Sequence, residues 1–258
     1  MLFVNNDGTK IYYEIEGEGP PLVLHHGLTD SPKLWRIAGY IEPLAKQYQT
    51  IILHVRGHGR SDKPHNPEAY SSESYVSDVV AVMDHQDHDK AHFWGYSLGG
   101  RVGLATGKYA PDRFVSVIVG GNWPVERDSK LNIDDLKGAV NIFKKGAEAI
   151  IAYYEEMKGE RLSDLERDLL LEADFEAALA YCAYRENIGM VEYLPTLATP
   201  HLFYAGDQDT FTHSNVERYV ESMQNAKFIS LPGLNHETTF YRSQLVLPHV
   251  LRFLSDNS

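Results

Sequence analysis

The sequence predicts an α/β fold in which helices cover both faces of a mostly parallel sheet and an all-helical segment is inserted as a cap. Short apolar runs typical of buried strands alternate with segments of helical periodicity, which is the pattern of βαβ units. A single stretch of roughly sixty residues holds helical segments and no strand candidate. The chain, at 258 residues, is long enough to bury a substantial core.

The strand candidates are recognised by β-branched and aromatic residues or by continuous apolar runs. The first follows the turn signal Asn6-Asp7-Gly8, and the second begins the series of runs typical of strands buried on both faces. In chain order the candidates are residues 9–15, 21–26, 50–55, 91–94, 114–119, 201–205 and 226–231. Helical patterns lie between them, including residues 74–83 and the small, apolar residues 98–109, which suit a helix packed closely against a sheet.

Residues 125–188 form the predicted cap. Its helical segments are residues 135–145, 147–157, 163–172 and 175–185. Because they interrupt the chain between two strands of one sheet, we expect a core domain of residues 1–124 and 189–258 that carries a helical cap, rather than two independent domains.

Composition and the distribution of apolar residues indicate which binding partners and which cellular location to expect. The formal net charge of −12 argues against binding to nucleic acid or to anionic membrane surfaces, because both would repel the chain. The N-terminus lacks the basic and apolar segments of a signal peptide, and no run of about 18 apolar residues occurs, so we expect no membrane span and a cytoplasmic location. The single cysteine, Cys182, excludes an intramolecular disulfide bond. We expect a monomer or a small homo-oligomer.

The segment Gly95-Tyr96-Ser97-Leu98-Gly99 fits the pattern G-x-S-x-G directly after a predicted strand and before a predicted helix. In that context the turn forces the serine into a strained conformation, and glycines on either side let the strand and the helix approach closely. The pattern therefore predicts Ser97 as a nucleophile.

A serine hydroxyl needs a general base, and the base needs an acidic residue that orients it. Two later strands are followed by suitable residues: Gly-Asp-Gln-Asp at 206–209 and Asn235-His236. Because the carboxyl ends of parallel strands meet at one edge of a sheet, we expect these residues to converge on Ser97. Both Asp207 and Asp209 are candidates for the acid.

Together these motifs resemble the α/β-hydrolase fold superfamily, in particular its serine esterase and lactonase branch with a helical cap, over almost the whole chain outside the cap. His26-Gly27-Leu28 is similar to the family's HG oxyanion loop, and RGHGRSDKP at residues 56–64 to its RGxGxSxxP segment. Residues 206–209 are similar to its GxxD turn. Two positions differ: His54 stands where the family commonly has Asp, and Asn235 replaces the usual glycine before the histidine.

The resemblance implies Ser97, Asp209 and His236 as a catalytic triad, with the fourth position of the GxxD turn favouring Asp209 over Asp207. It also implies that the backbone N–H groups of Leu28 and Leu98 form the oxyanion hole. Asp209 would raise the pKa of His236 and burial would lower it, so we expect a value within about one unit of 6.5.

The implied function is hydrolysis of a carboxylic ester or lactone of a small, fairly apolar substrate through an acyl-enzyme intermediate, with no cofactor. The same triad would also serve C–C bond hydrolysis, enol-lactone hydrolysis, perhydrolysis or acyl transfer. A receptor that binds a ligand without turnover is the alternative from another class. A serine nucleophile argues against the haloalkane dehalogenase and epoxide hydrolase branches, which attack through a carboxylate.

Further residues are candidates for metal ligands or for pocket walls. His54 with His58, or His85 with His88, could be imagined to hold a metal ion, but no HExxH or HxHxD pattern occurs, so we expect no metal. His25 and His26 are expected to brace the oxyanion loop through hydrogen bonds. The candidate pocket residues are Tyr96 and Trp123, and Trp123 could equally cover the hinge of the cap.

Overall fold

The computed structural model describes residues 2–124, 130–184 and 190–258. Its described residues form one eight-stranded sheet with the order β1-β2-β4-β3-β5-β6-β7-β8. From β4 to β8 all neighbours are parallel, whereas β2 pairs antiparallel with both β1 and β4. The strands are β1 (Leu2–Asn6), β2 (Thr9–Glu16), β3 (Pro21–His25), β4 (Gln49–Leu53), β5 (Ala91–Tyr96), β6 (Phe114–Gly120), β7 (His201–Gly206) and β8 (Ala226–Leu231).

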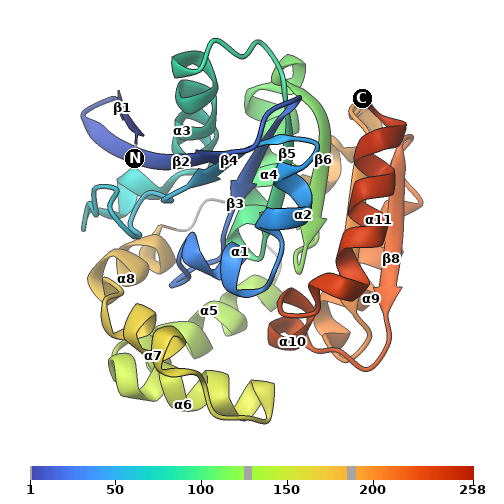
Figure 1. The fold of residues 1–258 in the computed structure, drawn as a ribbon. Coiled ribbons are helices and arrows are strands. Elements are labelled where there is room, and N and C mark those ends of the chain that lie inside the picture. Colours follow the sequence, from blue (N-terminus) through green and yellow to red (C-terminus); the bar gives the residue numbers. More distant parts are fainter. Residues whose placement is uncertain (1, 125–129, 185–189) are drawn as a thin grey trace.

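Helices cover both faces of this sheet (Figure 1). One face packs against α3 (Ser72–His85), α4 (Leu98–Tyr109) and α9 (Thr210–Val220), and the other against α1 (Lys33–Ile37), α2 (Ile41–Ala45) and α11 (Ser243–Asp256). Along β5, Phe93 belongs to the first apolar cluster and Trp94 to the second, because successive side chains of a strand point to opposite faces. Short 3₁₀ helices are η1 (Pro67–Tyr70), η2 (Pro111–Arg113), η3 (Met190–Glu192) and η4 (Leu194–Thr196).

Between β6 and β7 the described residues form four α-helices: α5 (Lys130–Phe143), α6 (Ala147–Lys158), α7 (Asp164–Leu171) and α8 (Phe175–Ala183). They gather at the end of the sheet where the arrows of the parallel strands point (Figure 1). They share an apolar cluster of their own, which includes Phe143, Ile151 and Cys182. The predicted fold class is thus confirmed. The predicted boundaries of the cap, at residues 125 and 188, lie outside the described residues, so the division into core domain and cap stays a prediction.

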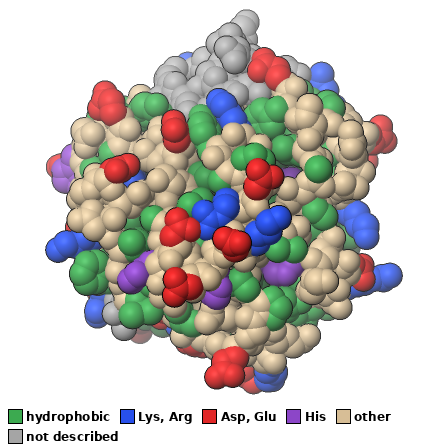
Figure 2. All heavy atoms as spheres, turned by 90° about the horizontal axis from the view of Figure 1, so that it is seen from above, with side chains coloured by type: hydrophobic (Ala, Val, Ile, Leu, Met, Phe, Trp, Pro, Cys, Tyr) green, Lys and Arg blue, Asp and Glu red, His purple; other side chains and the backbone are tan. Residues whose placement is uncertain are grey.

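The surface opposite the inserted helices, seen from above in Figure 2, carries acidic, basic and histidine side chains interspersed among apolar ones. Within residues 2–124, 130–184 and 190–258, no helix has both the length and the hydrophobicity needed to cross a membrane.

Candidate active site

Ser97 occupies a strained turn between β5 and α4. Its backbone angles are φ 53° and ψ −112°, a conformation that residues other than glycine rarely adopt. The glycines beside it have no room for a side chain: a Cβ on Gly95 would lie 2.0 Å from the carbonyl oxygen of Gly99, and a Cβ on Gly99 would lie 2.1 Å from that of His25. The close crossing of strand and helix therefore requires both glycines, as the motif predicts.

Asp209 and His236 follow β7 and β8, and the structure brings them together. His236 Nδ1 lies 2.9 Å from Asp209 Oδ2, while Asp209 Oδ1 accepts a hydrogen bond from the backbone N–H of Thr212 at 3.3 Å. Asp207 points elsewhere, since its Oδ1 accepts from the backbone N–H of Gly233 at 2.8 Å. Burial alone would raise the pKa of Asp209, but the bonds from His236 and Thr212 bring it below its ordinary value, so the carboxylate is ionised at neutral pH.

An ionised carboxylate can only accept hydrogen bonds. In neutral His236 the proton therefore lies on Nδ1, where it is donated to Asp209, and Nε2 is the basic nitrogen. Burial lowers the pKa of His236, but the bond to Asp209 and the negative charges of Glu237, Asp209 and Asp30 outweigh it and raise the pKa to about 9. The expectation of a value within about one unit of 6.5 is therefore wrong. It considered a single carboxylate beside the ring, whereas three affect it.

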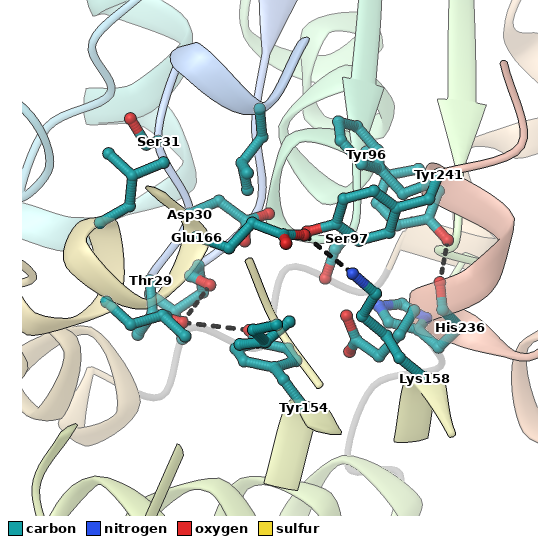
Figure 3. Close-up of a pocket in the computed structure, with 17 residues that line it drawn as sticks. Thr29, Asp30, Ser31, Tyr96, Ser97, Tyr154, Lys158, Glu166, His236 and Tyr241 are labelled. Atoms are coloured by element: carbon teal, nitrogen blue, oxygen red, sulfur yellow. Dashed lines mark hydrogen bonds and ion pairs between the residues drawn. The ribbon is translucent and has the colours of Figure 1, made fainter. Parts of the chain in front are cut away.

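A pocket lies between the sheet edge and the inserted helices, and its empty space, including the part that is open to solvent, is about 620 Å³ (Figure 3). Ser97, His236, Leu28 and Tyr96 all line it. Among the described residues no hydrogen bond joins Ser97 Oγ to His236, and in ligand-free enzymes such bonds are often long and tighten when substrate binds. The remaining lining residues are Thr29, Asp30, Ser31, Leu34, Tyr154, Lys158, Leu162, Glu166, Leu169, Leu170, Glu237, Phe240 and Tyr241.

The two candidate pocket residues differ in position. Tyr96 lines the pocket, and its hydroxyl donates a short hydrogen bond to the carbonyl oxygen of His236. Trp123 is not among the described residues that line the pocket; it packs, partly buried, against the apolar cluster on the α3 and α4 side of the sheet. Tyr96 thus supports the backbone of His236 as well as forming a wall.

Four charged side chains of the pocket lining were not predicted from the sequence. Lys158 Nζ lies 2.8 Å from Glu166 Oε1, and both side chains are only 8% exposed. Burial and the nearby Glu237 raise the pKa of Asp30 to about 7, while burial also raises the pKa of Glu237. Asp30 and Glu237 could have been found from their closeness in sequence to Gly27 and His236, but Lys158 and Glu166 carry no local signal.

Histidine rings brace the loop after β3, as predicted. His25 Nδ1 donates to the carbonyl oxygen of His26 at 2.9 Å, and His26 Nδ1 donates to that of Gly27 at the same distance. His26 Nε2 in turn accepts from the backbone N–H of Val55 at 3.3 Å. Both rings are buried, and burial lowers the pKa of each, to about 3 for His25.

His58 supports the same loop from the RGxGxS segment. Its Nε2 accepts from the backbone N–H of Thr29 at 2.9 Å, and its Nδ1 donates to the carbonyl oxygen of Arg56 at 3.0 Å. Leu28 precedes Thr29 at the pocket wall, while Leu98 is the first residue of α4 and has one of the N–H groups that lack a partner within a helix. The positive end of the α4 dipole suits negative charge at this position.

The histidine pairs considered as metal ligands are engaged in other contacts. His54 Nε2 lies 3.2 Å from Glu14 Oε1, and His85 Nδ1 lies 2.8 Å from the hydroxyl of Tyr13. In the part of the chain that the structure describes, no group of three or more His, Cys, Asp or Glu side chains is arranged to hold a metal ion.

The chain is similar to known proteins in sequence and in fold. The family model described as "alpha/beta hydrolase fold" matches residues 20–171. A putative 2-succinyl-6-hydroxy-2,4-cyclohexadiene-1-carboxylate synthase of Bacillus subtilis is 30% identical over 159 residues, 58% of this chain and 56% of that protein. The 3-oxoadipate enol-lactonase 1 of Acinetobacter baylyi is 23% identical over 219 residues, 82% of this chain and 80% of that protein.

The match to the Bacillus protein thus spans little more than half of that relative, whereas the match to the lactonase spans most of it. Among solved structures, the enol-lactonase from Burkholderia xenovorans superimposes with a TM-score of 0.82 at 23% identity, covering 98% of this chain and all of the other. At that identity the likeness concerns the fold. Since the family model covers more than half of the residues, the chain belongs to the alpha/beta hydrolase fold family.

Proposed function

We propose that the protein is a serine hydrolase that cleaves a carboxylic ester or lactone of a small substrate. The observation that supports this most strongly is the shared pocket: Ser97, held in a strained turn, faces the same cavity as His236, whose Nδ1 is bonded to Asp209. A nucleophile, a base and an orienting acid are the parts that acyl transfer through serine requires.

In the proposed reaction, His236 Nε2 removes the proton from Ser97 Oγ, which attacks the substrate carbonyl. The N–H groups of Leu28 and Leu98 stabilise the negative oxygen of the tetrahedral intermediate. His236 then protonates the leaving alcohol, and the acyl group stays on Ser97. A water molecule, deprotonated by His236, hydrolyses this acyl-enzyme and restores the serine.

Enol-lactones are the cyclic esters to test first, because a relative that aligns with most of this chain is named a 3-oxoadipate enol-lactonase. The pocket suits a small substrate with both apolar and polar parts: Leu34, Leu162 and Phe240 line it together with Asp30 and Glu237. The expectation of a fairly apolar substrate thus becomes a proposal for one that also carries polar groups.

The decisive experiment combines a fluorophosphonate probe with release of p-nitrophenol from short-chain esters. The wild type should react with both, and Ser97→Ala should lose labelling and about a millionfold in kcat while its melting temperature stays unchanged. Ser31→Ala, which alters another serine of the pocket wall, should keep the label. An unlabelled, inactive wild type would instead favour a ligand receptor, and residual activity in Ser97→Ala above about 1% would refute the assigned nucleophile.

A further inference from the structure

Helix α6 contacts the two loops that carry opposite parts of the proposed machinery. The hydroxyl of Tyr154 lies 3.2 Å from Thr29 Oγ1, in the loop of the proposed oxyanion donor. One turn further along α6, the carbonyl oxygen of Met157 accepts a hydrogen bond of 2.6 Å from Asn235 Nδ2, directly before His236. A single inserted helix therefore touches both the oxyanion loop and the histidine loop.

The side chain of Asn235 serves two elements at once. Its Oδ1 accepts from the backbone N–H of Thr238 at 2.9 Å and so caps α10 (His236–Phe240), whose first residue is His236. Its Nδ2 donates to Met157. Since Oδ1 meets donors and Nδ2 meets an acceptor, the orientation of the amide is unambiguous. The rigid amide plane thus joins the start of α10 to α6.

The partner of Asn235 is an end group of its helix. Met157 is the second-last residue of α6, so its carbonyl is one of the last four that have no i+4 partner within the helix. Lys158, the next residue, places its ammonium 4.1 Å from the ring centre of Tyr241, at the other end of α10. Consecutive residues of α6 therefore contact both ends of the short helix that begins with His236.

We propose that Asn235 is a positioning residue that makes the alignment of His236 depend on α6 being seated over the pocket. The inference rests on the proposed function, because it concerns the base of that reaction. Glycine, the usual residue of the family at this position, has no side chain and could neither cap α10 nor reach Met157. In this chain, contacts that seat α6 when substrate binds also orient the imidazole, so they contribute to kcat rather than to substrate affinity alone.

The test is Asn235→Ser, which separates the two contacts. Serine caps a helix about as well as asparagine but is too short to reach Met157. We expect kcat for p-nitrophenyl ester hydrolysis to fall about fivefold to tenfold, the effect of losing one hydrogen bond, with KM within about twofold and the melting temperature lowered by no more than about 4 °C. Amide hydrogen exchange in the last turn of α6 should become faster.

Asn225→Ser is the matched control. Asn225 Nδ2 also donates to a backbone carbonyl, that of Ala198 at 2.9 Å, but outside the pocket. This variant should keep the wild-type kcat. If the wild type is active and Asn235→Ser keeps its kcat, or loses no more than Asn225→Ser, the inference is overturned and the proposed function stands. A wild type that neither hydrolyses esters nor reacts with the probe overturns both.

Discussion

Asp209 and Asp207 lie two residues apart in one turn, yet only Asp209 reaches the imidazole of His236, at 2.9 Å. Asp207 instead holds the backbone of Gly233. We therefore expect Asp209→Asn to lower kcat by about ten-thousandfold, because an amide in place of the carboxylate favours the wrong tautomer of the ring. Asp207→Asn should change kcat by less than about threefold. Esterase assays of the two purified variants check this, and equal losses would reassign the acid.

The pH dependence of activity follows from the pKa of His236. The ring must be neutral to accept a proton from Ser97, and its pKa in the ligand-free protein is raised to about 9. We therefore expect kcat/KM, which reports the free enzyme, to rise with pH and to reach half its maximum near pH 9. A half-maximum near about pH 6.5, the ordinary value of histidine, would contradict the raised pKa.

The carboxylate of Glu237 can be tested separately. Glu237→Gln removes one of the negative charges that raise the pKa of His236, so the half-maximum should move to lower pH. Glu73→Gln, which alters an exposed carboxylate of α3, serves as the control and should leave the profile in place. Profiles that coincide for both variants would show that Glu237 does not set the pKa.

Substitution by alanine should have opposite effects on the free energy of unfolding at two of the glycines. Gly95→Ala places a Cβ 2.0 Å from a backbone oxygen of α4, so we expect a loss of more than about 3 kcal/mol in the free energy of unfolding and no probe labelling. Gly138 lies in α5, where a Cβ would meet no atom within 4 Å apart from its chain neighbours and the backbone of its own helix, and Gly138→Ala should gain about 0.5–1 kcal/mol. Urea unfolding measures both. A folded, labelled Gly95→Ala protein would show that the turn tolerates a side chain.

Local signals predicted the parts of the site that lie at strand ends. The G-x-S-x-G turn and the residues after β7 and β8 could be located because strand periodicity and turn glycines are properties of neighbouring residues. The choice of Asp209 over Asp207 came only from family resemblance, since both follow the same strand. The geometry agrees with that choice, because Asp209 contacts His236 and Asp207 contacts Gly233.

The contacts made by the inserted helices could not be predicted in the same way. Lys158 and Glu166 enter the pocket through the packing of α6 and α7, which no local pattern encodes. The bond to Asp209 and the charge of Glu237 contribute most to the raised pKa of His236, but a smaller part comes from Asp30, in a loop more than two hundred residues earlier in the chain. Asn235 differs visibly from the family pattern, but its bond to Met157 is apparent only in three dimensions.

The histidine rings that brace the oxyanion loop also lower the stability of the folded protein at acidic pH. His26 and His58 each accept a backbone hydrogen bond at Nε2, which a protonated ring would turn into a clash of two N–H groups. Burial lowers the pKa of both, to about 4 for His58, so the unfolded chain binds protons more readily as the pH falls below about 6.5. Each such ring therefore lowers the stability of the fold as the pH falls through that range, whereas Asp30 and Glu237, whose pKa values are raised, oppose this effect.

His25, His92 and His201 add to this slope, since burial lowers their pKa values to about 3, 4 and 4. Because the rings with lowered pKa values outnumber the groups that oppose them, the free energy of unfolding measured in urea should be smaller at about pH 5.5 than at about pH 7. Equal midpoints would mean that the rings stay accessible to protons in the fold. The hydrogen bonds that hold the oxyanion loop at neutral pH thus also contribute to the lower pH limit at which the protein stays folded.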